Sequence, residues 1–135
     1  MAFSVSPGES VSLVAGGSSG CPGVQVTNVG EGAVPPQTVS VALPPGNVLQ
    51  FKPEAGAYLL IICDAQANIA SYPGSLSGNS LVFQSVDLCL PGAGSTSVAW
   101  VTVAATSDSP AGFVNVSFVI GGLAANSSLI EVVRP

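Results

Sequence analysis

Short runs of β-branched and aromatic residues recur along this chain between clusters of glycine, proline, asparagine and serine. The runs begin about 10–15 residues apart, and no window places apolar residues at the i, i+3, i+4 and i+7 positions of an amphipathic helix. The sequence therefore predicts an all-β protein. The predicted strands are Ser10–Ala15, Val24–Asn28, Thr38–Leu43, Val48–Phe51, Tyr58–Asp64, Ile69–Tyr72, Leu81–Leu90, Ser97–Ala105, Phe113–Ile120 and Leu129–Val133.

Alternation within these runs indicates which strands have one face in the core. Apolar and polar residues alternate in Thr38–Leu43 and in Phe113–Ile120, as in half-buried antiparallel strands. Tyr58–Cys63 is apolar on both faces, which predicts a central strand covered on both sides or lying at an interface. We expect Trp100, the single tryptophan, to fill the core between two sheets; a platform for stacking on a sugar is the alternative.

Proline and glycine fall between the predicted strands, where proline removes no ladder hydrogen bond. Short strands with turns at this spacing predict an immunoglobulin-like two-sheet antiparallel β-sandwich, with about seven to nine strands and Greek-key connections. With 135 residues the chain is long enough for one domain. We expect an N-terminal arm over residues 1–9 and a single sandwich domain over residues 10–135.

Three segments occur in an order that resembles a known family. "VQVTNVGEG" ends a strand in Asn-x-Gly, "TVSVALPPG" runs from a strand into a proline–glycine turn, and "GSTSVAWVTVAATSDSPAGFVNVSFVIGG" joins two late strands through another. Between Val24 and Val133 the chain resembles the immunoglobulin-like repeats of bacterial and archaeal surface proteins, such as the cell-adhesion-related domain of bacteria. The resemblance implies an immunoglobulin-like fold and a non-catalytic, scaffold-like role, and it carries over no catalytic residue.

Charge is unusually scarce. Charged residues make up 7% of the chain, against about 25% in a typical domain, and the formal net charge is −5. Two cations, Lys52 and Arg134, are too few for nucleic-acid binding or for attachment to an anionic membrane. The longest apolar run, Ala57–Cys63, is too short to insert in a bilayer. Such composition is typical of secreted surface proteins and of proteins packed against neighbours.

Acid–base and nucleophilic catalysis most often use histidine, which this chain lacks, and the seven carboxylates are spread singly through the sequence. We therefore predict no enzymatic activity, no cofactor and no metal site. Asp64 and Asp87 stand near the ends of apolar strands, and we expect them to bond nearby backbone amides. A calcium site is the alternative, although the chain has no Asp-x-Asp-x-Asp-Gly segment.

The three cysteines, Cys21, Cys63 and Cys89, leave several interpretations open. All three are expected to be small buried apolar residues, because free cysteine is among the most buried residue types. A Cys63–Cys89 disulfide is the alternative, and a bridge through Cys21 is a third.

These observations predict a non-catalytic structural protein of an extracellular assembly that acts through protein–protein contacts. Two versions remain: a virion protein that decorates or cements a phage capsid, and a bacterial surface or adhesion module. No signal peptide is visible in this chain, so both versions stay open. Its partner is expected to be a second copy or a capsid or surface protein.

The alternative function is a carbohydrate-binding module of a secreted protein, which would bind a glycan. Tyr72, beside a proline–glycine turn, is expected to be free to stack on a sugar, and Glu31 is expected to be an exposed contact. The Asn28-Val29-Gly30 turn beside Glu31 is expected to be structural, with Asn28 bonding the backbone ahead of it and Gly30 and Gly32 allowing positive φ.

Two strand-like ends complete the pattern. "AFSVSP" near the start and "SSLIEVVRP" at the end each have the composition of a short strand. Either end could pair with the open sheet edge of a neighbouring protein, or both could complete the sheets of this chain.

Overall fold

The computed structural model describes residues 2–17, 19–46, 48–127 and 129–135. This part of the chain contains fifteen strands and no helix, so it has no helix able to cross a membrane. The predicted all-β fold is confirmed. The strands outnumber the predicted runs for two reasons. Thr102 separates two strands in Ser97–Ala105, and residues 115–116 separate two in Phe113–Ile120. The strands Phe3–Pro7, Ser75–Ser77 and Leu123–Asn126 lie outside the predicted runs.

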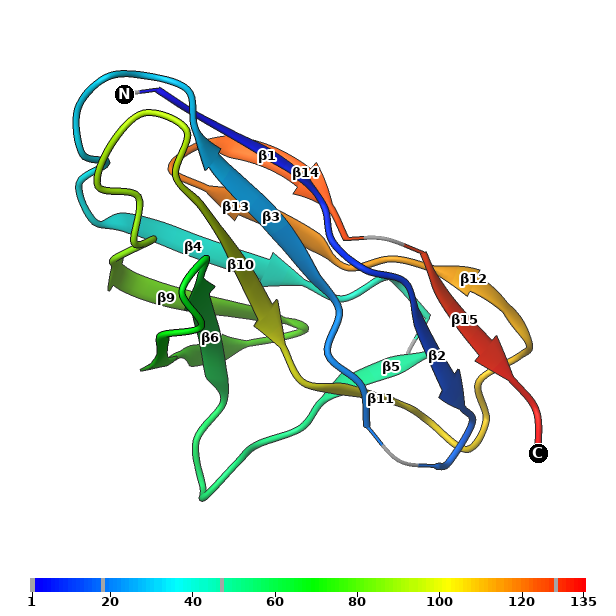
Figure 1. Ribbon diagram of the computed structural model, residues 1–135. Helices are drawn as coiled ribbons and strands as arrows, with labels where there is room; N and C mark the ends of the chain where they lie inside the picture. Colours follow the sequence, from blue (N-terminus) through cyan, green and yellow to red (C-terminus); the bar gives the residue numbers. More distant parts are fainter. Residues whose placement is uncertain (1, 18, 47, 128) are drawn as a thin grey trace.

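The first sheet forms one layer of a sandwich (Figure 1). All its neighbouring strands are antiparallel. In spatial order it consists of β1 (Phe3–Pro7), β3 (Gly23–Asn28), β10 (Thr96–Val101), β6 (Leu59–Asp64) and β7 (Ile69–Pro73).

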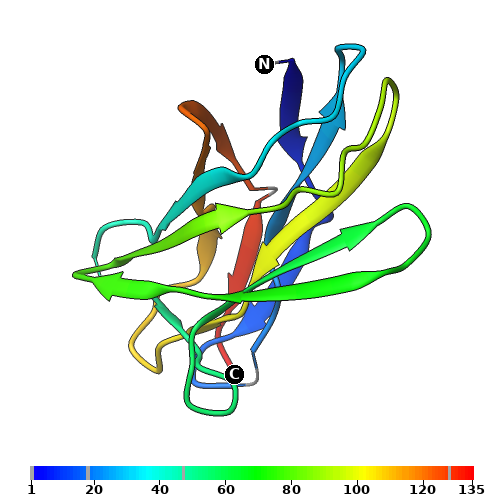
Figure 2. The same ribbon diagram turned by 90° about the vertical axis from the view of Figure 1, so that its left-hand side faces the viewer.

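The second sheet forms the opposite layer, and it too is antiparallel. The green ribbon in Figure 2 runs from β7 in the first sheet into β8 in the second, and so links the two layers. In spatial order the second sheet consists of β14 (Leu123–Asn126), β13 (Ser117–Ile120), β4 (Gln37–Ala42), β9 (Ser80–Val86) and β8 (Ser75–Ser77).

Two smaller sheets extend the sandwich at the end of the molecule where the C-terminus lies (Figure 1). One consists of β12 (Gly112–Val114), β15 (Ile130–Val133) and β2 (Val11–Val14), and the other of β11 (Val103–Ala105) and β5 (Leu49–Phe51). β15 and β2 run parallel, which departs from the purely antiparallel arrangement that was predicted. Strands far apart in sequence pair in every sheet, as crossover connections require.

The core lies between the two layers and is built from the inward positions of each strand. Val39 and Val41 on β4 and Phe118 and Ile120 on β13 are fully buried, so the predicted faces of these alternating strands are confirmed. The 0% exposed Leu60 and Ile62 of β6 meet them from the first sheet. One predicted strand is too long, because β9 ends at Val86 rather than Leu90.

Both ends of the chain complete its own sheets. β1 pairs with β3 over Phe3–Pro7, and β15 pairs with β2 and β12. Pairing of either end with a neighbouring protein is thus not needed to satisfy these strands. Met1 lies outside the described residues, and the division of the chain at residue 9 stays a prediction. The two termini lie at opposite ends of the molecule (Figure 1).

Candidate functional site

The turn after β3 is held together by Asn28. Its Oδ1 accepts a hydrogen bond from the Gly30 amide at 2.9 Å, which confirms the predicted turn. Its Nδ2 donates to the Gly32 carbonyl at 2.9 Å and to the Leu90 carbonyl at 3.2 Å. Neither Gly30 nor Gly32 uses the positive φ that glycine allows. Gly30 is instead required by close approach, because a Cβ there would lie 2.6 Å from the Ala2 Cβ.

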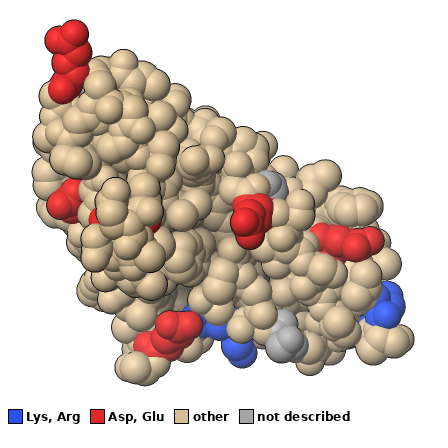
Figure 3. Space-filling model, in the orientation of Figure 1, with Lys and Arg blue, Asp and Glu red and all other residues tan. Residues whose placement is uncertain are grey.

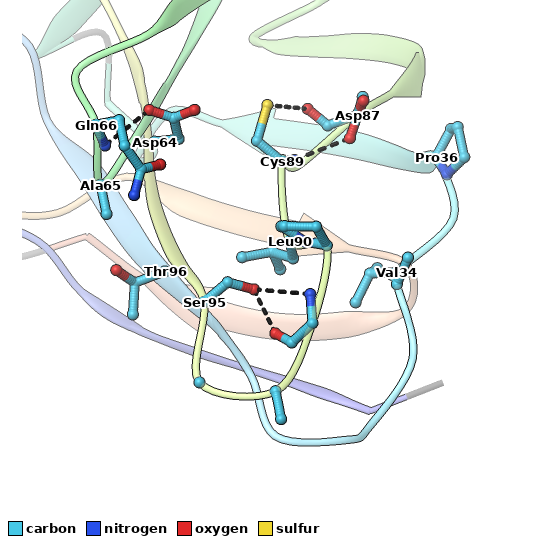
Figure 4. A pocket seen from close by; sticks show the side chains of 15 residues that line it. Val34, Pro36, Asp64, Ala65, Gln66, Asp87, Cys89, Leu90, Ser95 and Thr96 are labelled. Carbon is cyan, nitrogen blue, oxygen red and sulfur yellow. Dashed lines mark hydrogen bonds between the residues drawn. The ribbon is translucent and has the colours of Figure 1, made fainter.

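A hollow of about 770 Å³ lies at the same end of the sandwich (Figure 4). Three segments line it: the loop around Val34 and Pro36, the turn that follows Asp64, and the segment from Asp87 to Thr96. Cys89 has φ of +57° and Ser85 has φ of +53°, so the chain leaves the extended conformation here. β9 continues through Ser85 to Val86, and the segment beyond it carries Asp87 and Cys89 to the hollow.

The two carboxylates of the hollow are engaged with backbone, as predicted. Asp64 Oδ1 accepts hydrogen bonds from the amides of Gln66 and Asn68, and its Oδ2 accepts one from the Asn68 side chain. Asp87 Oδ1 accepts the Cys89 amide at 2.9 Å. The bonds from Asn68 and Gln66 hold the pKa of Asp64 below its usual value. Both residues therefore shape turns, and among the described residues no three His, Cys, Asp or Glu side chains gather as a metal site.

The three cysteines are free thiols in the structure. Cys21 is exposed and Cys63 and Cys89 are half-buried, so the expectation that all three are buried is wrong. Burial, with the nearby charges of Asp87 and Asp64, raises the pKa of the Cys89 thiol.

Strand alternation separates Cys63 from Cys89. Cys63 lies opposite Val98 on the outer face of the first sheet, whereas the next residue, Asp64, points to the side of the hollow, where Cys89 lies. The Cys63–Cys89 bridge stays a prediction, with both partners unbonded here.

Tyr72 and Glu31, the two predicted contact residues, have different surroundings. Tyr72 is half-buried against the core and pairs with the inward-facing Leu60, and its hydroxyl oxygen accepts a hydrogen bond from the Asp87 amide at 3.2 Å. Its role as a sugar contact stays a prediction. Glu31 is exposed beside a small hollow next to Ala2, and its contact role stays a prediction.

Trp100 does not fill the core. Its neighbours Ala99 and Val101 on β10 are 0% and 1% exposed, so alternation turns the half-buried indole to the outer side of the first sheet. Gly23 lies opposite Trp100 in the register, and a Cβ at Gly23 would be 2.8 Å from the Trp100 Cβ. The core does not need Trp100, because the fully buried rings of Phe83 and Phe118 fill it from the second sheet.

Trp100 belongs to an apolar surface that we call the Trp100 face. Its members share the outer side of β10, β6 and β7, and cross-strand pairs join Trp100 to Ile61, Val98 to Cys63 and Cys63 to Ile69. Ile69 is 66% exposed, and the other members are half-buried. The Trp100 face consists of Leu59, Ile61, Cys63, Ile69, Val98 and Trp100.

The Trp100 face carries no charge. The outward positions of β1 and β3, which continue the same sheet, hold Ser, Thr and Gln. Figure 3 shows that charged side chains are few and scattered over the side of the molecule seen there. Sequence reasoning missed this surface because it assigned Trp100 to the core. The signal was present in Tyr58–Cys63, whose apolar residues on both faces indicated a covered strand or an interface.

Comparisons with known proteins identify solved structures with a similar fold. No family model and no curated protein sequence match the chain. The major pilin subunit BcpA of Bacillus cereus is similar with a TM-score of 0.60 and 9% identity, over 98% of this chain. The seventh ScaB type I cohesin from Pseudobacteroides cellulosolvens is similar with a TM-score of 0.56 and 12% identity.

The extent of these two matches differs. The alignment with the pilin covers 40% of that protein's length, whereas the alignment with the cohesin covers 99% of this chain and 92% of the cohesin. At such low identity the likeness concerns the fold. The chain is therefore an all-β sandwich with immunoglobulin-like and cohesin-like structural neighbours, as the sequence predicted.

Proposed function

We propose that this chain is a non-catalytic structural module of a bacterial cell-surface assembly and works through contacts with other proteins. The observation that carries the proposal is the Trp100 face, a set of neighbouring apolar side chains without charge on the outer side of the first sheet. Apolar patches of this kind on a folded domain are often interaction sites. The fold agrees with this role, since a pilus subunit and a cohesin have similar structures.

The hollow beside Asp64 supports a structural role in preference to catalysis. Its two carboxylates accept hydrogen bonds from turn amides, and the raised pKa of Cys89 keeps that thiol protonated near neutral pH. A general base must lie within hydrogen-bond reach of the proton that it removes, whereas these two carboxylates already accept hydrogen bonds from the backbone of their own turns. We therefore assign the hollow to the folding of the loops around it.

The location of the protein tests this proposal. Antibodies against the chain, applied to intact cells of the source organism, should label the cell surface by immunogold microscopy. The virion version, in which the same contacts serve a capsid, predicts label on purified particles instead. Label confined to the interior of lysed cells, with neither surface nor particles stained, would contradict a role in an extracellular assembly.

A glycan-binding module is the second candidate, and the outward position of Trp100 favours it. An indole on a flat sheet face is suited to stacking on a sugar ring, and Gln25 on the neighbouring strand could supply hydrogen bonds. A glycan array should then show hits that disappear in Trp100→Ala and persist in Tyr72→Phe, which keeps the packed ring. An array without hits removes this candidate.

A further inference from the structure

The hollow beside Asp64 has a further property besides its part in the folding of the loops. Its volume of about 770 Å³ lies within the range of roughly 300–1,000 Å³ that is typical of ligand sites. Val34 and Leu90, which line it, are 7% and 2% exposed, so its floor is apolar and buried. The Leu90 carbonyl accepts hydrogen bonds from the Val34 amide and from the Asn28 side chain, which hold this floor in place. The hollow is therefore preformed, and binding there requires little reordering of the loops.

Two carboxylates line the hollow from different segments of the chain. Asp64 ends β6, and Asp87 follows β9. Burial is the largest cause of the raised pKa of Cys89, and the charges of Asp87 and Asp64 add to it, so both carboxylates lie near that thiol (Figure 4). A carboxylate can accept about four hydrogen bonds, and the Cys89 amide takes one position on the exposed Asp87. Asp87 thus keeps acceptor positions for a donor that enters the hollow.

The part of the chain that the structure describes supplies no cation to these carboxylates. The residues that line the hollow include no Lys and no Arg. Arg134 donates hydrogen bonds to the carbonyls of Ser107 and Ser109, and the Lys52 amide bonds the Thr102 carbonyl, so both cations are held beyond the far end of β10. The hollow therefore combines a negative charge with an apolar floor.

We propose that the hollow receives a Lys or Arg side chain from a loop of a partner protein. The inference rests on the proposed function, in which this chain works through contacts with other proteins, and it gives one such contact a chemistry. The positive end of the side chain meets Asp87 and Asp64, and its methylene stem lies on Val34 and Leu90. A neutral or acidic side chain would leave the two carboxylates without a counter-charge. A basic partner surface also suits the formal net charge of −5 on this chain, whereas a second copy would be repelled.

NMR titration of the full chain with a short peptide tests this proposal. The probe is acetyl-Gly-Arg-Gly-amide, and the control probe replaces the arginine with citrulline, which has a similar shape without the charge. The arginine peptide should shift the backbone amide signals of Gln66, Cys89 and Ser95 with a roughly millimolar Kd, because a single solvated ion pair contributes little. Raising sodium chloride from about 20 mM to about 500 mM should weaken this binding several-fold. A citrulline peptide that binds equally well overturns the proposal.

A matched pair of variants shows whether the hollow is the site. Asp87→Asn removes a charge from the hollow, while its side-chain oxygen can still accept the Cys89 amide. Asp108→Asn removes the same charge from an exposed turn beyond the far end of β10, so both variants have the same net charge. Asp87→Asn should weaken binding of the arginine peptide several-fold, and Asp108→Asn should bind like the wild type. Equal affinity in the two variants, each with the amide spectrum of a folded chain, overturns the proposal.

Methylguanidinium distinguishes a side chain from a free cation. It carries the charge of arginine without the long methylene stem, so it should bind more weakly than the peptide because it leaves Val34 and Leu90 uncovered. If methylguanidinium binds as tightly as the arginine peptide, the hollow takes small free cations, and a partner protein's side chain is overturned as its occupant.

The outcomes separate this inference from the proposed function. If immunogold finds the chain on the cell surface and the arginine peptide does not bind, the hollow is not a contact site and the surface role stands. If the peptide binds in the hollow and neither cell surface nor particles are labelled, the contact site stands and the role in an extracellular assembly fails.

Discussion

At the scale of single residues, Asn28 connects three segments of backbone. Its side chain bonds the Gly30 amide and the carbonyls of Gly32 and Leu90, while its own carbonyl accepts the Gly94 amide. Asn28 is 1% exposed, so any of these groups that loses its partner is left away from water.

Asn28→Ala should therefore lower the free energy of unfolding by about 2–4 kcal/mol, because the buried partners lose their hydrogen bonds. Urea denaturation followed by circular dichroism measures the loss. The matched control is Asn79→Ala, since Asn79 is exposed and makes one 3.4 Å bond to the Leu43 carbonyl. We expect the control to change stability by less than about 0.5 kcal/mol. Equal losses in the two variants would mean that Asn28 does not hold the loops together.

Asp64 should make stability depend on pH in acid. Its pKa is lowered in the folded state, so its contribution is present above the unfolded value of about 3.9 and is lost as pH falls through the lower folded value. NMR titration of the Asp64 carboxyl carbon should show the depressed pKa in the wild type. Asn68→Ala removes the hydrogen bond from the side-chain amide and should move the pKa upward. An Asp64 pKa unchanged by Asn68→Ala contradicts this cause.

The cysteines should differ in their reactivity. Cys21 is exposed, whereas burial and two carboxylates raise the pKa of Cys89. Since the thiolate is the reactive form, iodoacetamide at pH 7.5 should modify Cys21 before Cys89. Mass spectrometry of timed digests measures both rates, and Asp87→Asn, which removes one nearby charge, should speed up Cys89. If Cys89 reacts first in the wild type, its surroundings are not as described.

At the scale of elements, strand β10 shows what sequence could and could not predict. The pattern of Ser97–Ala105 separates Val98 and Trp100 from Val101 and Val103, and the structure keeps that separation. Both sets are apolar, however, so alternation alone could not say which set faces the core. Trp100 was expected to face inward, although the inward positions of β10 beside it hold small side chains such as Ala99.

The other strands also fall into two groups: those that their own sequence predicts, and those that depend on pairing with a neighbouring strand. β4 was predictable because its outward residues Thr38 and Ser40 are polar. β14, with the sequence Leu-Ala-Ala-Asn, and the three-residue β8, Ser-Leu-Ser, contain no β-branched residue, and pairing with β13 and β9 makes them strands. The left-handed backbone at Ser85, inside β9, and at Cys89, beyond its end, could not be predicted, because these residue types seldom adopt it.

The close packing of β3 against β10 can be tested at Gly23. A Cβ at this position would clash with the Ala99 carbonyl oxygen, so Gly23→Ala forces the two strands apart. We expect a loss of about 1–3 kcal/mol in the free energy of unfolding. Gly92→Ala is the control, because a Cβ there meets nothing within 4 Å, and it should be neutral or slightly stabilising. Thermal denaturation of both variants checks the difference, and a stable Gly23→Ala protein would show that the strands have room.

At the scale of the whole molecule, low charge and an outward apolar face belong together. A soluble domain normally limits exposed apolar patches and keeps charges spread over its surface. This chain has two cations and seven acids, and none of them lies on the outer side of the first sheet. The first sheet thus presents a neutral apolar surface, and the proposed role of the protein follows from that surface.

The most direct measurement is acrylamide quenching of Trp100 fluorescence, since Trp100 is the single tryptophan and lies within the proposed contact surface. In the folded protein, acrylamide should quench Trp100 measurably but more slowly than in the unfolded chain, because the indole is half-buried on the outer side of the first sheet. A Trp100 fully shielded from acrylamide in the folded monomer would place the indole in the core, and the contact surface would not exist.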